Sequence, residues 1–282
     1  MNWYARYLPL FEKDYDSIPD SLIQQVKQSL KAVHSDNPLV SVVAIAHNEE
    51  RRILACLWSL AENKVDFPIE ILVVNDASTD RTAEVLDRVG AYWVYEEKKS
   101  PGYARQRGED VAKGKYLICI DSDTIYPPDY IRLMTMELER PGVVGVTGLW
   151  SYVPDKDHGR FALSFYEMLR DINLSLIWVK RPEQVVRGMV FGYNLEAGRK
   201  APYRVQIRRG EDGAKANDLK SYGKLFFLKD RRARVFTSTS TIRADGSIWK
   251  SLWVRIAKSF RRFRTYFKGE KEYKDQESNM MK

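Results

Sequence analysis

Short apolar runs alternate with amphipathic stretches along the first half of the chain. The runs are rich in Val and Ile and have the length of buried strands. The stretches between them repeat apolar residues every three or four positions, as in helices that pack one face on a sheet. This pattern predicts strands at 39–46, 69–74, 92–95, 116–120 and 143–149, and helices at 50–61, 82–88, 103–112 and 129–139. Strands that alternate with helices indicate an α/β fold with a mostly parallel sheet.

The flanking regions are less regular. An amphipathic helix is expected from Asp20, where Ser21 and Gln24 have capping-box spacing. Further on, the pattern predicts a helix at 160–179, a glycine-punctuated loop at 187–194, a helix at 214–221 that stops at Gly223, and strands at 224–228 and 234–237. We divide the chain into a helical extension (1–37), an α/β domain (38–240, with halves 38–149 and 150–240) and a C-terminal segment (241–282).

Polar residues follow three of the predicted strands. These are Ala46-His47-Asn48-Glu49, Asn75-Asp76 and Asp121-Ser122-Asp123. In an open α/β sheet, ligands bind outside the carboxyl ends of the strands, so these groups are expected to meet. Asp-x-Asp also occurs at 14–16 and 155–157, but only Asp121/Asp123 follows an apolar strand. Its two hard oxygen ligands suit a divalent cation that carries phosphates; a turn capped by aspartate is the alternative.

Composition narrows the class of protein. A chain of 282 residues with 44% hydrophobic residues is long enough for one large domain. Cys56 and Cys119 lie inside apolar patterns, which indicates a reducing compartment without disulfides, and three scattered histidines argue against a zinc site. The most apolar long stretch, 161–179, contains charged residues, and the N-terminus lacks the layout of a signal peptide. We therefore expect a cytoplasmic protein.

The net charge of +8 is concentrated in one segment. Residues 246–269 carry +7 and no acid, which leaves +1 for the rest of the chain. Aromatic and aliphatic residues recur there at helical spacing, so a basic amphipathic helix is expected. Such a helix suits an anionic membrane surface, and packing of its aromatic face on the domain fits the spacing equally well. Nucleic acid is a weaker third choice and is not expected as a partner, because basic charge alone attracts any polyanion and does not single out nucleic acid.

Five segments, in order between Leu39 and Ser238, resemble motifs of the family 2 glycosyltransferases, which have the GT-A fold. The opening strand with Ala-His-Asn-Glu resembles the nucleotide loop, and Val-Val-Asn-Asp-Ala-Ser-Thr-Asp resembles the second motif, with Asn75 and Ala77 replacing Asp and Gly. Gly-Tyr-Ala-Arg-Gln-Arg-Gly, from Gly102, resembles the segment whose arginine approaches the donor. Asp-Ser-Asp matches the metal motif, and Arg-Gly-Glu-Asp, ending at Asp212, matches the motif of the catalytic base.

The resemblance implies a role for each matching residue. Mn²⁺ or Mg²⁺ would lie on Asp123 and Asp121, and Asp212 would take the proton from the acceptor hydroxyl in a single inverting displacement. The implied donor contacts are Ala46, His47, Glu49, Asp76, Arg105, Asp121 and Ser122. The implied acceptor contacts are Gly188, Asn194 and Glu211. A surface ion pair for Arg105 and a helix N-cap for Asp212 are the structural alternatives, and the acidic pair Glu109-Asp110 is expected to be solvated surface.

We therefore expect a metal-dependent, non-processive transferase. The donor is expected to be a UDP-sugar, with GDP and dTDP as alternatives. The acceptor is expected to be a lipid-linked molecule or a glycan of cell-surface polysaccharide or glycoconjugate synthesis, reached from the cytoplasmic face of the membrane. Two other readings stay open. Ile-Asp-Ser-Asp-Thr also resembles the first motif of haloacid dehalogenase phosphatases, with Asp121 as nucleophile. The chain could also be a non-catalytic GT-A scaffold at a membrane surface.

Overall fold

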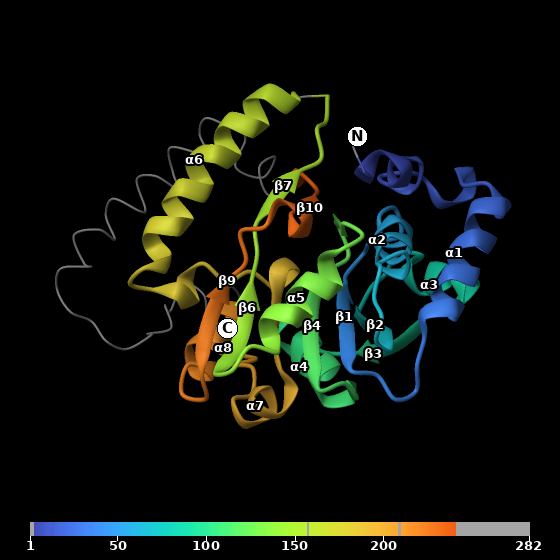
Figure 1. The fold of residues 1–282 in the computed structure, drawn as a ribbon. Coiled ribbons are helices and arrows are strands. Elements are labelled where there is room, and N and C mark those ends of the chain that lie inside the picture. The colour runs from blue at the N-terminus through green and yellow to red at the C-terminus, as the bar shows by residue number, and fades with distance from the viewer. Residues whose placement is uncertain (1–2, 157, 208–209, 241–282) are drawn as a thin grey trace.

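The computed structural model describes residues 3–156, 158–207 and 210–240. Its centre is a seven-stranded sheet in the order β3-β2-β1-β4-β8-β6-β9 (Figure 1). All neighbouring strands run parallel except β8, which is antiparallel to β4 and β6. The strands are β1 (Val40–Ala46), β2 (Ile69–Asp76), β3 (Tyr92–Glu96), β4 (Tyr116–Asp121), β6 (Val143–Thr147), β8 (Phe191–Asn194) and β9 (Lys224–Phe227). The predicted α/β class with a mostly parallel sheet is confirmed.

Helices cover both faces of this sheet. The helices are α1 (Asp20–Val33), α2 (Ile53–Ala61), α3 (Thr82–Val89), α4 (Pro101–Val111), α5 (Tyr130–Leu138), α6 (Arg160–Trp178), α7 (Leu195–Lys200) and α8 (Glu211–Leu219). Alternate residues of one strand enter different cores: Val42 and Ala44 pack with α1, α2, α3 and α5, and Val43 packs with α4, α7 and α8. This is why the central strands are apolar at nearly every position.

A second, three-stranded sheet lies above the carboxyl end of the main one. Its order is β5-β10-β7, formed by Thr124–Ile125, Val235–Thr237 and Trp150–Tyr152. Because β5 follows β4 directly, the pairing of Thr237 with Thr124 brings the end of the described chain to the Asp121-Ser122-Asp123 turn. The small sheet therefore joins distant segments at the edge where ligands are expected.

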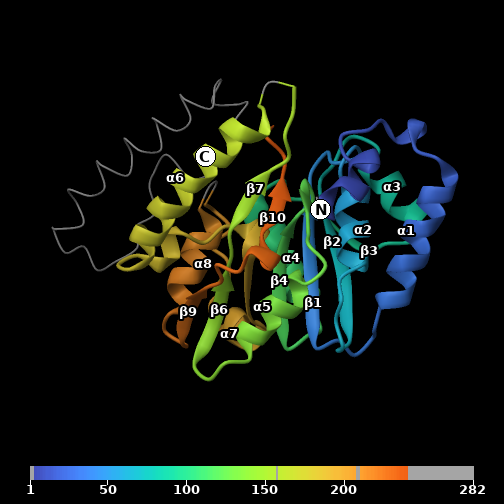
Figure 2. The same ribbon diagram turned by 45° about the horizontal axis from the view of Figure 1, so that its top comes forward.

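The N-terminal extension packs into the same core. The 3₁₀ helix Trp3–Leu10 buries Tyr4, Tyr7 and Leu10, and the Tyr4 ring stacks on Phe236 with centroids 4.2 Å apart. A second 3₁₀ turn, Tyr15–Ser17, leads into α1. In two views, α1 and α3 lie at one end of the main sheet and α6 lies at the other (Figures 1 and 2).

Two local predictions were wrong. The capping box at Ser21 and Gln24 does not form: α1 begins at Asp20, so Ser21 already lies inside the helix, and the N-cap is Pro19, without a side-chain capping bond. The predicted loop at 187–194 is a 3₁₀ turn, Gly188–Val190, followed by β8 in the middle of the sheet. The glycines made this segment look like a loop in the sequence. In the structure Gly192 lies close to β4, because a Cβ on it would be 3.2 Å from the carbonyl oxygen of Leu117. Within the described ranges, no helix is long and apolar enough to cross a membrane; the basic segment 246–269 lies outside them.

Candidate active site

The carboxyl ends of β1, β2 and β4 meet at one edge of the sheet, as the sequence predicted. Ala46 pairs with Asn75, and Ile45 pairs with Asp121, so the polar residues that follow these strands start at the same level. The three strands are neighbours, with β1 between β2 and β4. A turn capped by aspartate, the alternative considered for Asp121 and Asp123, does not require this convergence.

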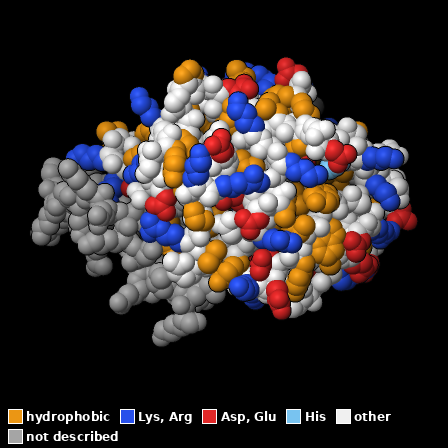
Figure 3. All heavy atoms as spheres, turned by 90° about the horizontal axis from the view of Figure 1, so that it is seen from below, with side chains coloured by type: hydrophobic (Ala, Val, Ile, Leu, Met, Phe, Trp, Pro, Cys, Tyr) orange, Lys and Arg blue, Asp and Glu red, His pale blue; other side chains and the backbone are white. Residues whose placement is uncertain are grey.

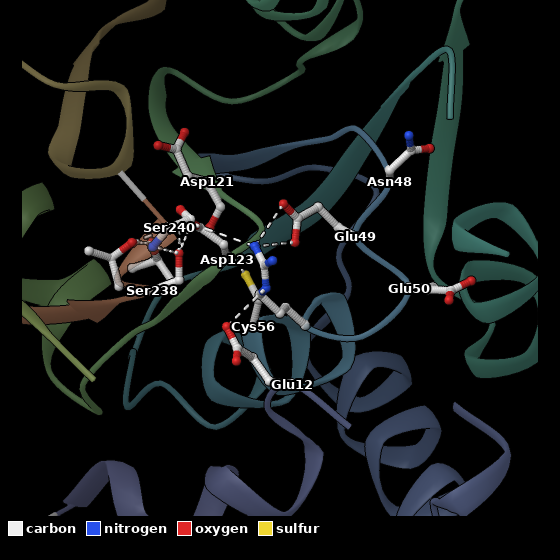
Figure 4. A network of polar contacts seen from close by, with 12 residues as sticks. Glu12, Asn48, Glu49, Glu50, Cys56, Asp121, Asp123, Ser238 and Ser240 are labelled. Carbon is white, nitrogen blue, oxygen red and sulfur yellow. Dashed lines mark hydrogen bonds and ion pairs between the residues drawn. The ribbon is translucent and has the colours of Figure 1, made fainter. Parts of the chain in front are cut away.

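Asp123 is held by the small sheet. Its carboxylate accepts hydrogen bonds from Ser238 Oγ at 2.5 Å and from Thr237 Oγ1 at 3.3 Å, and its carbonyl accepts one from the Ser238 amide at 3.1 Å. In Figure 4, Ser238 and Ser240 approach Asp123 from the side opposite Glu49. Arg52 Nη1 lies 4.0 Å from Asp123 Oδ2. Sequence reasoning missed Ser238 and Arg52, because nothing local connects Ser238 with a residue 115 positions earlier.

Arg105 joins two carboxylates inside the protein. Its side chain is 2% exposed, Nη2 donates to Asp121 Oδ1, and Nη1 donates to the carbonyl of Ile120 at 2.8 Å. Arg105 Nε lies 3.7 Å from Asp212 Oδ1, which is an ion pair but too long for a hydrogen bond. The surface ion pair considered for Arg105 is therefore wrong, and the guanidinium links β4 to the start of α8.

The absence of a side chain at Gly188 leaves space for the ion pair between Arg105 and Asp212. A Cβ at position 188 would overlap Arg105 Nη2 and would lie 2.7 Å from Asp212 Oδ2. Asp212 is the second residue of α8, whose N-cap is Gly210, so the capping role considered for Asp212 is excluded. Asp212 Oδ1 is buried and accepts no hydrogen bond from the described residues. A carboxylate in this state can accept a proton from a bound hydroxyl.

Acidic groups crowd the region between β1 and β4. Burial raises the pKa of Glu49 to about 8, although Arg52 opposes the shift; the charges of Asp123 and Asp121 add to it. Burial also raises the pKa of Asp121 to about 6, with Arg105 acting in the opposite direction. In Figure 4, Asp121, Asp123 and Glu49 lie in the same region, whereas Glu50 lies apart from them. Crowded, poorly solvated carboxylates of this kind favour the approach of a cation.

A divalent cation fits these residues only together with a ligand. Asp121 and Asp123 offer hard oxygen atoms, but no group of three or more His, Cys, Asp or Glu in the described ranges is arranged to hold a metal. Mg²⁺ is typically bound by one or two carboxylates and completed by substrate phosphates and water. These two carboxylates therefore suit a metal ion that binds together with a diphosphate.

Asp76 and His47 form the part of the edge nearest β2. Asp76 is 5% exposed, and its Oδ1 accepts a hydrogen bond from the Ser100 amide at 2.9 Å. His47 Nδ1 donates to the carbonyl of Asp76 at 2.6 Å. Burial raises the pKa of Asp76. These contacts place Asp76 and His47, which are both predicted to contact the nucleotide-sugar, beside each other at the end of β1.

The remaining predicted residues divide into two groups. Ser122 is buried in the turn between Asp121 and Asp123. Glu211 lies beside Asp212. Burial raises the pKa of Glu211 to about 7, and the charge of Asp212 adds to the shift. Asn194 lies elsewhere, because it pairs with Tyr116 at the amino end of β4. Its Oδ1 accepts a hydrogen bond from the Ala197 amide at 3.0 Å and caps α7. The structure does not bring Asn194 to the site.

The prediction that Glu109 is solvated was also wrong. Glu109 and Lys215 side chains are both 0% exposed, and Lys215 Nζ donates to Glu109 Oε2 at 2.5 Å. Lys215 also donates to the carbonyl of Gly198 at 2.7 Å, and Tyr193 donates to Glu109 at 2.7 Å. This buried cluster ties α4, which carries Arg105, to α8, which carries Asp212.

Comparison with known proteins agrees with this architecture. The sequence model of glycosyl transferase family 2 matches residues 41–194, more than half of the chain. The uncharacterized glycosyltransferase YibD of Escherichia coli K12 is 33% identical over 113 residues, which is 38% of this chain and 32% of YibD. The chain thus matches only about a third of the length of this relative.

Two solved structures share the fold. The mannosyltransferase PcManGT of Pyrobaculum calidifontis, in complex with GDP-Man and Mn²⁺, has a TM-score of 0.53 and 20% identity, covering 83% of this chain and 68% of PcManGT. S. aureus TarS, in complex with UDP-GlcNAc, also has a TM-score of 0.53, with 18% identity over 71% of this chain and 58% of the TarS fragment. With the family match over residues 41–194, these findings show that the chain belongs to glycosyl transferase family 2.

Proposed function

We propose that this chain is an inverting glycosyltransferase that moves a sugar from a nucleotide-sugar to an acceptor hydroxyl. The observation that carries the proposal is the link from Asp121 through buried Arg105 to Asp212 at the carboxyl edge of the sheet. The link supports the proposal because Asp212, the proposed proton acceptor, lies 3.7 Å from the guanidinium that also pairs with Asp121. No observation in the described residues favours the phosphatase or the non-catalytic scaffold.

Asp121 and Asp123 would hold Mn²⁺ or Mg²⁺ together with the donor diphosphate. When bound, the cation would neutralise phosphate charge and make the nucleoside diphosphate a better leaving group. Ser238 and Thr237 orient the Asp123 carboxylate through their hydroxyl groups. Arg105, buried against Asp121, would hold that carboxylate and would add positive charge near the donor diphosphate.

Asp212 would act as the base. Its carboxylate would take the proton from the acceptor hydroxyl as that oxygen forms a bond to the anomeric carbon and the bond from this carbon to the diphosphate breaks. A single displacement of this kind inverts the anomeric configuration. Glu211 and the backbone at Gly188 flank Asp212, so both remain proposed acceptor contacts. We leave Asn194 out of the acceptor site, since it lies at the other end of β4.

The donor site is proposed to run from Asp121 across β1 to β2. Ala46, His47, Glu49, Ser122 and the buried Asp76 line this edge and would contact the nucleotide. A UDP-sugar is the first choice, because TarS, which has the same fold, binds UDP-GlcNAc; GDP is the alternative that PcManGT suggests. A lipid-linked or glycan acceptor, and attachment to the cytoplasmic face of a membrane through 246–269, complete the proposal.

The role of Asp212 can be tested by Asp212→Asn, which keeps the size of the side chain but cannot take a proton. General base catalysis typically contributes about 10²–10⁴-fold, so sugar transfer should fall by at least ~100-fold while nucleotide affinity stays unchanged. Asp110→Asn is the matched control, because Asp110 lies exposed on α4. Radiolabelled sugar transfer and titration calorimetry measure the two quantities. Loss of nucleotide binding in Asp212→Asn would assign this residue to the donor instead.

A further inference from the structure

Arg52 lies among three carboxylates at the start of α2. Its Nη1 is 3.2 Å from Glu49 Oε2 and 4.0 Å from Asp123 Oδ2, and its Nε is 3.7 Å from Glu12 Oε1. These four side chains are between 16% and 37% exposed, so water screens their charges only in part. Figure 4 shows Glu12, Glu49 and Asp123 in one network of polar contacts. Arg52 thus carries a positive charge beside a carboxylate that is proposed to bind metal.

Glu12 reaches Arg52 from the N-terminal extension. The extension is fixed on α2, because Tyr7 donates to Glu62 Oε2 at 2.9 Å and its ring meets Trp58 edge-on with centroids 5.1 Å apart. Glu12 has a φ of 57°, in the left-handed region that residues with a Cβ avoid. Backbone outliers of this kind cluster at functional sites. A segment that precedes the first strand therefore contributes an acid to the surroundings of Asp123.

The neighbouring pair of Arg51 and Asp14 joins the same two segments on the solvent side. Arg51 Nη2 lies 3.2 Å from Asp14 Oδ1, and the two side chains are 52% and 78% exposed. Exposed charges of both signs are common on this molecule, because acidic and basic side chains are interspersed over the face seen from below (Figure 3). Such pairs contribute little. Arg51 and Asp14 are therefore a matched comparison for Arg52 and Glu12.

Arg52 is held less tightly than Arg105. Arg105 is 2% exposed and pairs with Asp121 and Asp212 inside the protein. Arg52 is 26% exposed, and its 4.0 Å contact with Asp123 is at the limit of an ion pair. The Asp123 carboxylate is therefore not saturated by Arg52, but any ion that binds to it meets the charge of the guanidinium.

We propose that Arg52, moderated by Glu12, makes the site select a complex of metal and nucleoside diphosphate over the free metal. A divalent cation alone is repelled by the guanidinium, because both are positive. A complex of Mn²⁺ with a nucleoside diphosphate carries net negative charge, so the same guanidinium attracts it. Glu12 is a positioning residue that holds Arg52 and neutralises part of its charge. The inference rests on the proposed function, since it takes Asp123 as a metal ligand.

A purely structural role for Arg52 predicts a different result. If Arg52 only joined α2 to the extension, its loss would loosen Glu49 and Asp123 and would weaken the binding of metal and of nucleotide alike. The charge of Arg52 instead has effects of opposite sign on the two ligands. The direction of each change therefore separates the two roles.

Binding of Mn²⁺ alone to the full-length protein, followed by the electron paramagnetic resonance signal of the free ion, is the first measurement. Arg52→Gln should lower the Kd of Mn²⁺ at least ~3-fold, because a like charge is removed. Glu12→Gln should raise this Kd at least ~2-fold, because the charge of Arg52 is then less neutralised. Arg52→Lys keeps the charge and should stay within ~2-fold of the wild type.

Calorimetric titration of UDP at saturating Mn²⁺ is the second measurement. Arg52→Gln should raise the Kd of UDP at least ~3-fold, opposite in direction to its effect on Mn²⁺ alone. Arg51→Gln and Asp14→Asn should leave both constants within ~2-fold of the wild type, since exposed pairs are screened. In the Arg52→Gln background, Glu12→Gln should change the Kd of Mn²⁺ less than it does in the wild type, because Glu12 acts through Arg52.

Three results would overturn the inference. The first is a change of the same sign in the Kd of Mn²⁺ and of UDP for Arg52→Gln, which would assign a structural role. The second is no change in either constant. The third is an equal effect of Arg51→Gln and Arg52→Gln, which would reduce the effect to general surface charge. Absence of Mn²⁺ binding by the wild type in the presence of UDP would overturn the metal role of Asp123 in the proposed function, so the two failures are distinguished.

Discussion

Ala77 adopts an unusual backbone conformation in the turn that follows β2. Its φ is 48°, in the left-handed region that residues with a Cβ avoid. The turn is held by its hydrogen bonds: the Ala77 amide donates to the carbonyl of Glu96 at 3.0 Å, and the Ser78 amide donates to Asn75 Oδ1 at 3.1 Å. The related motif of the family has Gly where this chain has Ala77, and Gly is the residue that this conformation favours.

Ala77→Gly should therefore stabilise the protein. Relief of the strained φ outweighs the extra backbone entropy of glycine in the unfolded chain, and a gain of about 0.5–1 kcal/mol in the free energy of unfolding is expected. Ala83→Gly, inside α3, is the matched control and should cost about 1 kcal/mol. Urea unfolding followed by circular dichroism measures both. A lower urea midpoint for Ala77→Gly would show that the turn does not impose this φ in solution.

At the scale of elements, the relative position of α4 and α8 decides whether Arg105 reaches Asp212. The hydrophobic pattern predicted both helices, but it could not show which side of α4 faces inward. Arg105 and Glu109 are one helical turn apart on the buried side, together with Gly102 and Gly108. Small residues there let the helix approach the sheet: a Cβ on Gly108 would overlap Val43.

The buried pair of Glu109 and Lys215 should be essential to this packing. Lys215→Met leaves the Glu109 carboxylate buried without its partner, and such a loss typically costs about 3–5 kcal/mol of stability. Glu109→Gln/Lys215→Met removes both charges and keeps an acceptor for the Tyr193 hydroxyl, so at least half of the lost stability should return. Chemical unfolding of the two variants measures the difference.

An exposed pair provides the control for this experiment. Lys200 and Glu196 form an ion pair at 2.6 Å on the surface of α7, with 57% and 80% of the side chains exposed. Lys200→Met should leave the unfolding midpoint unchanged, because exposed pairs are screened by solvent. Equal losses in Lys215→Met and Lys200→Met would contradict the importance of burial.

At the scale of the whole molecule, the proposed active site draws on segments from most of the described chain. Strands β1, β2 and β4 provide its floor, α4 and α8 provide Arg105 and Asp212, and β10 brings Ser238 to Asp123. Binding at such a site stabilises the entire fold, since none of these segments is in place in the unfolded chain.

Nucleotide and metal should therefore raise the melting temperature together. UDP with Mn²⁺ should stabilise more than the sum of the two alone, because Asp121 and Asp123 provide only part of a coordination shell. At a ligand concentration of ~100 Kd, the stabilisation should be about 2.7 kcal/mol. Differential scanning fluorimetry with UDP, GDP and dTDP compares the nucleotides. EDTA and Asp123→Ala should each abolish the joint effect; its persistence in Asp123→Ala would remove this residue from the metal site.

The sequence by itself determined the elements and the edge at which chemistry is proposed. Helical and alternating periodicities are local properties, so β1 to β4, β6 and most helices could be predicted to within a few residues, whereas the two-residue strand β5 could not. Polar residues directly after apolar strands then had to meet, because parallel strands end at the same side of a sheet. Ala46, Asp76 and Asp121 followed from that rule alone.

Only the tertiary structure decided which distant residues touch. Three contacts join positions far apart in the chain: Ser238 donates to Asp123, Arg105 is buried against Asp121, and Lys215 pairs with Glu109. The place of Asn194 away from the site is of the same kind. Periodicity shows that a helix or strand has two faces, but the neighbours that cover each face come from elsewhere in the chain.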